Sequence, residues 1–195
     1  MPSPIAHISA AWVISSFFRN HVAKVTRAFS DRRMLLFLVC VFFSLLPDVD
    51  AVPGVLSGEM GRFHNQWTHS ILWAFVLSAV IAFIARCRRK GGFGDWFTLI
   101  FSCYGIHILM DYFTYGRGVR LFWPFTATRY KFNPPFFGGF HWSEGLFSRS
   151  HITTAVEEIS FGAILIGSYC VIELLWRGFS KNSDAALEDK TRERG

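Results

Sequence analysis

The sequence predicts an all-α protein, a polytopic membrane helix bundle of about five membrane-associated helices with a metal site at one membrane face. Of the 195 residues, 51% are hydrophobic and 17% aromatic, which is too apolar for an ordinary soluble domain. The apolar residues form long runs, and the basic residues sit in short clusters beside those runs. This is the pattern of the positive-inside rule, so we assign the net charge of +6 to membrane orientation and not to nucleic-acid binding.

The N-terminal third contains two expected helices. Residues 5–18 form an apolar run of 14 residues, which is shorter than the roughly 20 that cross a hydrocarbon core. We therefore expect this helix to be tilted, partly re-entrant or buried by its neighbours. The basic residues 19–33 are placed on the cytoplasmic side, and the next apolar run, 34–46, ends in the segment Leu46-Pro47-Asp48-Val49-Asp50.

The pair Arg32-Arg33 before the run 34–46 has the form of a twin-arginine export signal, which would be cleaved. The region before the pair is long, however, no Ala-x-Ala cleavage motif follows, and further apolar runs come later in the chain. A retained membrane helix is the favoured interpretation.

Three further helices are expected downstream. Pro and Gly in 52–63 predict turns before the apolar run 71–85, which a basic cluster at 86–90 closes. A long segment, 95–115, is followed by a loop rich in Gly, Pro and aromatic residues, 116–150, which is typical of the membrane interface. The last span covers 159–176. We expect residues 1–178 to form one membrane-embedded domain and residues 179–195 a charged, disordered cytoplasmic tail.

The basic clusters also place the ionisable residues of the apolar segments. With 19–33, 86–90 and the C-terminal tail in the cytoplasm, the five segments alternate across the membrane. Seven ionisable residues from four segments then fall together at the opposite, outer face of the membrane. They are His7, Asp48, Asp50, His64, His69, His107 and Asp111.

Each of these groups has a structural explanation when it is taken alone. His107 and Asp111 are four residues apart, on one face of a helix, and could be a pair that locks helix packing. Asp48 and Asp50 follow a helix-ending proline, where Asp is common in solvated turns. His7 could be a satisfied core histidine. Gathered at one depth, however, these residues form a mixed set of nitrogen and oxygen ligands.

Imidazole and carboxylate ligands together suit zinc, and manganese or iron less exclusively. Seven candidates exceed the four ligands of a single zinc ion. One or two ions are therefore expected, and a two-ion site with a bridging carboxylate fits the number of ligands better. Asp48 or Asp50 would be the catalytic residue, either as the bridge between ions or as a base.

Other polar residues near the same face have open roles. Arg117, Arg120 and Arg129 could hold a phosphate group or contact the headgroups of ordinary lipids. Residues in or just after the long loop could be further ligands, substrate contacts or ordinary interfacial residues. These are His141, Glu144, His151, Glu157 and Glu158.

The order of these residues resembles a known family, the membrane-bound metal-dependent hydrolases typified by the LexA-regulated inner membrane protein YdjM. The family pattern is an early His, Leu-Pro-Asp-x-Asp, a central His-Arg-x-x-Thr-His-Ser, and His-x-x-x-Asp-x-x-Thr with a following Gly and Pro. It is matched within residues 5–176 by His7, Leu46-Pro47-Asp48-Val49-Asp50, His64, Thr68-His69-Ser70, His107, Asp111, Thr114, Gly118 and Trp123-Pro124. The resemblance implies a metal-dependent enzyme. We expect its substrate contacts to include Thr68, Thr114, Arg117 and Arg120.

One position departs from the family pattern. The residue after the first His of the central motif is usually Arg and is Asn65 here, which leaves the substrate class open. The family is in turn distantly similar to zinc-dependent phospholipases C, which also use His and Asp residues around several zinc ions. Those enzymes carry a later His-x-x-x-Glu pair. His141 and Glu144 do not have that spacing, so a third metal is not expected.

We therefore expect a membrane-bound, zinc-type hydrolase that acts at the periplasmic face on a phosphoester, such as a phospholipid headgroup or a lipid-linked phosphate. Membrane lipids are its expected partners, and nucleic acid is not. The alternative is a non-catalytic metal-binding or transport-associated membrane protein. A transporter should carry ionisable residues near the bilayer midplane and at both faces, whereas here they gather at one face.

Overall fold

The computed structural model describes residues 4–22, 29, 32–59, 63–88, 91–136, 138–139 and 150–192, with side chains as far as residue 180. Five longer helices carry the described fold: α1 (Pro4–His21), α3 (Arg33–Leu45), α5 (Ile71–Cys87), α6 (Phe93–Tyr112) and α7 (Ser150–Arg192). Three short elements join them: the 3₁₀ helices η1 (Leu46–Ala51) and η2 (Trp67–His69), and the helix α4 (Val52–Leu56). The described residues contain no β-strand, only an isolated antiparallel bridge between Val119 and Tyr130. The predicted all-α fold is confirmed.

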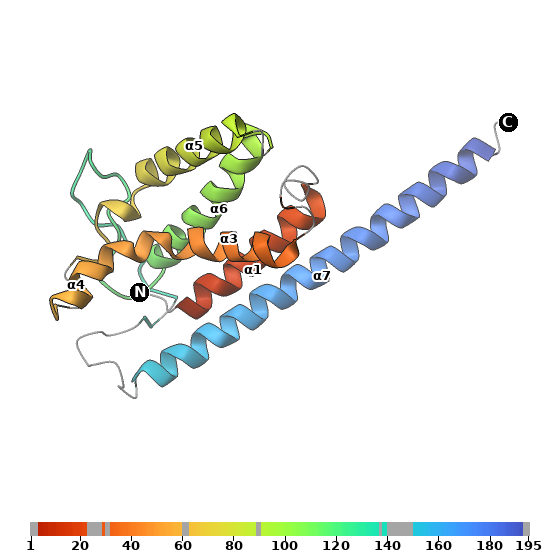
Figure 1. Cartoon of the computed structure of the whole chain (residues 1–195). Coiled ribbons are helices and arrows are strands. Elements are labelled where there is room, and N and C mark those ends of the chain that lie inside the picture. The colour runs from red at the N-terminus through yellow and green to blue at the C-terminus, as the bar shows by residue number, and fades with distance from the viewer. Residues whose placement is uncertain are drawn as a thin grey trace.

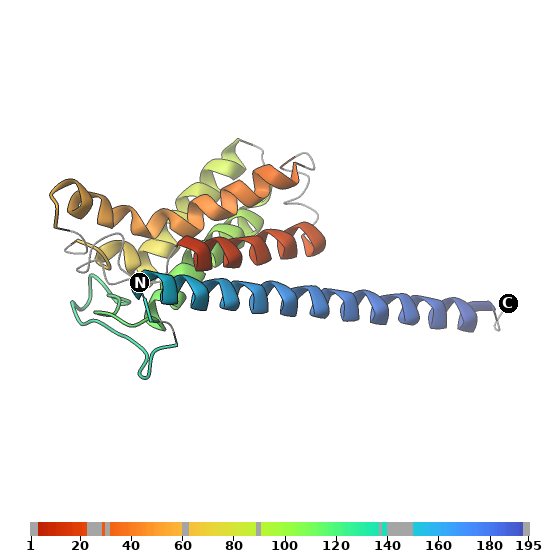
Figure 2. The same ribbon diagram turned by 90° about the horizontal axis from the view of Figure 1, so that it is seen from below.

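The helices α1, α3 and α6 form the centre of the bundle (Figures 1 and 2). α5 packs on α6, and α7 runs along α1 and continues past the end of the bundle. Buried residues of the three central helices, among them Cys40, Leu99 and Cys103, make the core between them. The core is therefore built by the same helices whose ends carry the candidate ligands.

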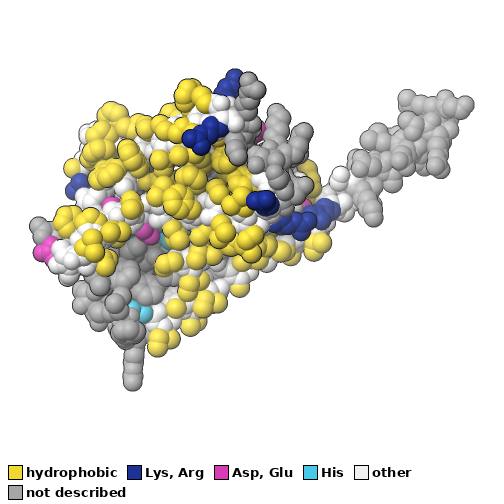
Figure 3. Space-filling model, viewed as in Figure 1, with side chains coloured by type: hydrophobic (Ala, Val, Ile, Leu, Met, Phe, Trp, Pro, Cys, Tyr) yellow, Lys and Arg dark blue, Asp and Glu magenta, His cyan; other side chains and the backbone are white. Residues whose placement is uncertain are grey.

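Three helical stretches are long and apolar enough to cross a membrane: Arg33–Leu56, Phe93–Tyr112 and His151–Ser180. α5 is a shorter apolar helix, and α1 is not among the candidate spans. Apolar side chains cover most of the surface seen in Figure 3. Large apolar groups such as Phe42, Phe83 and Ile164 are more than half exposed, which suits contact with lipid and not with water.

The ends of four segments meet at one end of this bundle. They are the start of α1, η1 at the end of α3, η2 before α5, and the last turn of α6. Pro47 in the first turn of η1 redirects the chain after α3, because proline cannot continue a regular helix. Ser70 caps α5, since its hydroxyl oxygen accepts a hydrogen bond from the Trp73 amide at 3.2 Å. These local signals place η1 and η2 side by side.

The structure differs from the sequence-based expectation at the C-terminus. α7 begins at Ser150, the last residue of the expected loop and nine residues before the expected span, and it continues to Arg192, into the segment expected to be disordered. The composition explains the extension, because Ala185, Ala186 and Leu187 are strong helix formers and the tail contains no proline. High charge predicted disorder here, but it does not prevent helix formation.

Candidate metal centre

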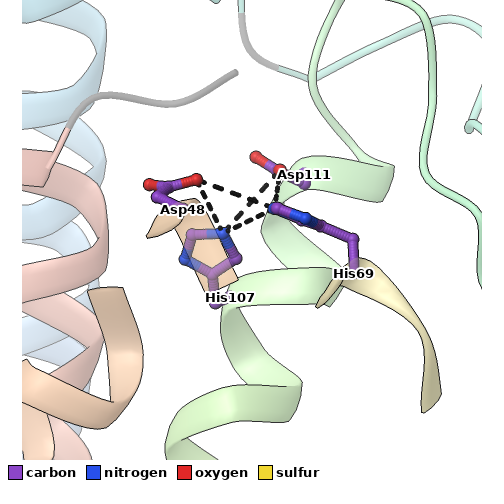
Figure 4. Close-up of side chains that lie close together, drawn as sticks. All are labelled: Asp48, His69, His107 and Asp111. Carbon is purple, nitrogen blue, oxygen red and sulfur yellow. Dashed lines mark hydrogen bonds and ion pairs between the residues drawn. The ribbon is translucent and has the colours of Figure 1, made fainter. Parts of the chain in front are cut away.

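Two carboxylates and two imidazoles from three elements point toward one another at the end of the bundle (Figure 4). Asp48 comes from η1, His69 from η2, and His107 and Asp111 from the last turns of α6. One ligand atom of each lies within 4.8 Å of the other three. His69, His107 and Asp111 are buried, and the side chain of Asp48 is 20% exposed. We call these four residues the metal cluster.

Hydrogen bonds fix which nitrogen of each histidine faces the cluster. His107 Nδ1 lies 2.7 Å from the backbone oxygen of Ser44, an acceptor only, so Nδ1 carries the proton. His69 Nδ1 lies 3.2 Å from Asp50 Oδ2. The two remaining nitrogens, both Nε2, lie 3.2 Å apart. If both nitrogens were unprotonated, their lone pairs would repel each other at this distance. The arrangement therefore requires a cation or a proton between the two nitrogens.

The separations in the metal cluster match those of metal ligands. Ligands about 2.1 Å from a zinc ion at tetrahedral angles lie about 3.4 Å from one another. Asp48 Oδ1 lies 3.6 Å from His69 Nε2 and 3.3 Å from His107 Nε2. Asp111 Oδ2 lies 3.2 and 3.8 Å from the same two nitrogens. The donor set and its spacing therefore fit a transition-metal ion.

Asp50 lies behind the metal cluster and is saturated with hydrogen bonds. Its Oδ2 accepts one from the Gln66 amide at 2.9 Å and one from the Thr68 hydroxyl at 2.7 Å, and it faces His69 Nδ1. Its Oδ1 lies 3.1 Å from His64 Nδ1. Asp50 thus orients two imidazoles so that their Nε2 atoms face inward, as the outer carboxylate of a metal site does.

Several buried polar atoms around the cluster have no hydrogen-bond partner. They include both oxygens of Asp111, Nε2 of His64 and both ring nitrogens of His7. The His7 ring stacks on that of His107 at 3.9 Å between centroids. Buried polar groups are rarely left without partners unless they serve a bound ion or water. These atoms could supply ligands to a second ion beside the first.

The carboxylates also determine the charge of His69. Burial alone would lower the pKa of this imidazole, but the neighbouring carboxylates of Asp111, Asp48 and Asp50 raise the pKa well above its usual range. Without a metal ion, these carboxylates therefore favour a proton on His69. Binding of a cation would displace that proton, which is the usual exchange at histidine ligands.

Three arginines of the loop after α6 lie close together near the segment that leads into η2. Arg117 donates to the His64 carbonyl at 3.4 Å, and Arg129 donates to the carbonyls of Asn65 and Gly118, both at 3.0 Å. Burial, together with the nearby Arg117 and Arg120, lowers the pKa of Arg129. The buried Nε of Arg120 has no hydrogen-bond partner. Guanidinium groups that crowd in this way favour a bound anion.

The other predicted site residues lie in different positions. The Thr114 hydroxyl donates to the Met110 carbonyl at 2.7 Å, within its own helix end. His151 and Glu158 are buried near the start of α7, and Glu157 accepts a hydrogen bond from the Gly138 amide at 3.2 Å. His141 and Glu144 lie outside the described residues.

Three contributors to the site were missed by the sequence analysis: the Ser44 carbonyl, the Gln66 amide and Tyr104. The Tyr104 hydroxyl donates to the Thr68 carbonyl at 2.8 Å and so holds η2 against α6. Tyr104 stands three residues before His107, on the same helix face. That spacing was the signal that could have found it, whereas backbone partners leave no pattern in a sequence.

Comparison with known proteins identifies the family of the chain. A family model described as YdjM inner membrane protein matches residues 5–183. The chain is also similar to the inner membrane protein YbcI of Escherichia coli strain K12, with 32% identity over 94 residues, or 46% of this chain and 54% of that protein. The match thus spans about half the length of the curated relative. No solved structure matches.

Proposed function

Because this chain belongs to the YdjM family of inner membrane proteins and buries a cluster of His and Asp ligands, we propose that it is a membrane-bound metal-dependent hydrolase. Its substrate is a phosphoester such as a phospholipid headgroup or a lipid-linked phosphate. The observation that carries the proposal is the set of inward-facing ligand atoms without hydrogen-bond partners in a buried site. The active site faces the periplasm and the C-terminus lies in the cytoplasm, as the distribution of basic clusters favours.

Asp48, His69, His107 and Asp111 would hold the first ion, with zinc favoured over manganese or iron. Four protein ligands would close a zinc site, and catalytic sites keep a position open. The unpartnered atoms of His64, His7 and Asp111 would be available as ligands of a second ion. Metal ions so held lower the pKa of a water molecule and offset charge on phosphoryl oxygens.

The chain's own groups take complementary roles. Asp48 is the cluster's carboxylate that solvent reaches, since its side chain is 20% exposed and that of Asp111 is fully buried. Its Oδ1 faces the cluster, so we assign Oδ2 as the acceptor of the proton that the attacking water loses. Asp50 keeps the imidazoles oriented. The proposal thus retains Asp48 as catalytic and makes Asp50 a positioning residue.

Two further features favour a lipid phosphoester. The arginines at 117, 120 and 129 supply positive charge where a phosphate would lie, which compensates for Asn65 at the position that is usually Arg in the family pattern. A cavity of about 690 Å³ between α1, α5 and α6 is lined almost wholly by apolar groups. Its wall includes Ile108 and Tyr112, the chain neighbours of His107 and Asp111, so an acyl chain would lie close to the reacting group.

Metal content and hydrolysis test the proposal together. Purified full-length protein should contain about one to two equivalents of zinc, manganese or iron by mass spectrometry. His69→Ala and Asp111→Ala should lose that metal and the release of phosphate-containing product from a phospholipid panel. His21→Ala, at the opposite end of the bundle, is the matched control and should keep both.

The possible outcomes separate the proposal from its alternative. Wild-type protein without stoichiometric metal contradicts the site itself. Bound metal without hydrolysis of any phospholipid or phosphodiester supports a non-catalytic metal-binding or transport-associated protein instead. Circular dichroism of the two alanine variants distinguishes a lost ligand from a lost fold.

A further inference from the structure

A second cavity, of about 590 Å³, lies at the end of the bundle away from the metal cluster. It is formed where α1 ends, α3 begins and α7 passes both helices. Polar residues make up most of its wall: Arg19, Asn20, His21, Arg32, Arg33, Glu173, Arg177 and Ser180, with Phe29, Leu36 and Trp176 as the apolar part. We call this cavity the basic pocket.

The wall of the basic pocket carries excess positive charge. Among the described residues that line it, four are arginines and Glu173 is the single carboxylate. Both oxygens of Glu173 are already paired: Oε2 lies 2.9 Å from His21 Nε2, and Oε1 accepts from Arg177 Nε at 2.9 Å. The acid therefore offsets only part of the charge, and the pocket attracts anions.

The start of α3 adds to this positive potential. The helix begins at Arg33, and its N-cap residue, Arg32, provides no side-chain hydrogen bond to the first turn. The uncapped amides at the start of a helix carry partial positive charge and favour anions. Two arginine side chains and the end of a 13-residue helix thus converge on one cavity.

The surroundings of the pocket favour a lipid over a free ion. Trp176 lines the cavity, and tryptophan prefers the level of the headgroups in membrane proteins. Next to it α7 exposes Ile172, Leu175 and Phe179, each more than half accessible, along a stretch apolar enough to cross the membrane. A lipid with its phosphate in the basic pocket would pack its acyl chains against this apolar surface of α7.

The geometry points to a binding site for the phosphate headgroup of an anionic phospholipid in the basic pocket. Basic pockets between membrane helices on the cytoplasmic side are suited to such headgroups. This site is separate from the metal cluster and does not depend on the proposed hydrolase activity. A lipid bound there would contact α1, α3 and α7 at once.

The test measures lipid retention by the purified full-length protein in a neutral detergent. Native mass spectrometry should show bound phosphatidylglycerol at concentrations where phosphatidylcholine does not bind. The double variant Arg32→Gln and Arg33→Gln should weaken phosphatidylglycerol binding about 25-fold. Each arginine near the lipid phosphate contributes a factor of about five, and the two factors multiply. Metal content, measured on the same sample, should not change and reports that the other end of the bundle is intact.

The matched control removes the same two charges outside the pocket. Arg86→Gln with Arg88→Gln, at the end of α5, should alter phosphatidylglycerol binding less than twofold. Equal losses in both double variants would mean a general surface attraction and overturn the proposal. Displacement of the lipid by millimolar inorganic phosphate would assign the pocket to free phosphate and overturn the lipid assignment. Equal retention of both lipids would overturn the site altogether.

Discussion

The facing Nε2 atoms of His69 and His107 show how single hydrogen bonds determine the chemistry of the whole cluster. Each ring gives its other nitrogen to an oxygen acceptor, the Ser44 carbonyl for His107 and the Asp50 carboxylate for His69. The partner of Nδ1 thus decides where the Nε2 lone pair points. Residues outside the metal cluster would therefore influence the affinity for a bound ion.

Thr68 tests this dependence on the outer hydrogen bonds. Its hydroxyl donates to Asp50 Oδ2 at 2.7 Å, so Thr68→Val removes a hydrogen bond and little volume. We expect the zinc affinity to fall about tenfold, because outer partners of ligating histidines contribute about 10–100-fold. Competition with a chromophoric chelator measures it. Thr98→Val, on the exposed side of α6, is the control, and an equal loss there would contradict the argument.

His7 tests the second ion. Its ring stacks on His107 at 3.9 Å, and both of its nitrogens are buried without a hydrogen-bond partner. His7→Phe keeps an aromatic ring for the stack and removes both nitrogens. We expect the metal content to fall from about two ions per chain to about one, measured by mass spectrometry. An unchanged content of two would make His7 a packing residue.

At the scale of single residues, the sequence predicts which types of side chain form the site and at which end of the bundle they lie. It does not predict the role of each residue. The pattern of His and Asp identified the four residues of the metal cluster because ligand types and helix spacing are visible in a sequence. It also grouped Asp50 with the ligands, and Asp50, His64 and His69 do form a second group whose ligand atoms lie close enough to hold an ion. What the sequence does not show is that η1 turns the Asp48 carboxylate toward the metal cluster and gives Oδ2 of Asp50 hydrogen bonds from Gln66 and Thr68.

At the scale of elements, the contact between α1 and α7 relies on small residues. An added Cβ at Gly162 would lie 2.5 Å from Ser9 Oγ and 3.1 Å from Ser9 Cβ, so the two helices approach closely there. Small residues allow such close approach between membrane helices. The sequence does not show where the loop ends and α7 begins. An apolar helix that faces lipid has no periodic polar face that would mark its first residue.

Gly162→Val should therefore push α7 away from α1. We expect a loss of about 1–3 kcal/mol, or a fall of about 2–10 °C in Tm, as for other overpacked sites. Gly167→Val is a matched control on the same helix, since an added Cβ at Gly167 meets no atom within 4 Å. Thermal unfolding of both variants in detergent measures the difference. Equal Tm values would mean that the contact between α1 and α7 does not stabilise the protein.

At the scale of the whole molecule, the chain separates its charges between two ends. The carboxylates and histidines of the site lie where α3 and α6 end, and the arginines of the basic pocket lie where α1 ends and α3 begins. In Figure 3 the Lys and Arg side chains gather mainly toward the end away from α4. This separation of basic from acidic side chains was predictable, because clusters of Lys and Arg in a sequence indicate the cytoplasmic side. The depth of each side chain in the membrane was not predictable, since helix tilt depends on packing.

Cysteine labelling tests the orientation that this polarity predicts. Cys87 is exposed at the end of α5 that carries Arg86 and Arg88, so we expect it in the cytoplasm. A membrane-impermeant maleimide should then label Cys87 in inverted membrane vesicles and not in intact spheroplasts, with Cys87→Ser as the blank. In a Cys87→Ser background, Ser57→Cys, which is exposed beyond α4 near the site, should show the reverse pattern. Labelling of Cys87 from outside would place the metal cluster in the cytoplasm, because both ends of α5 would exchange sides.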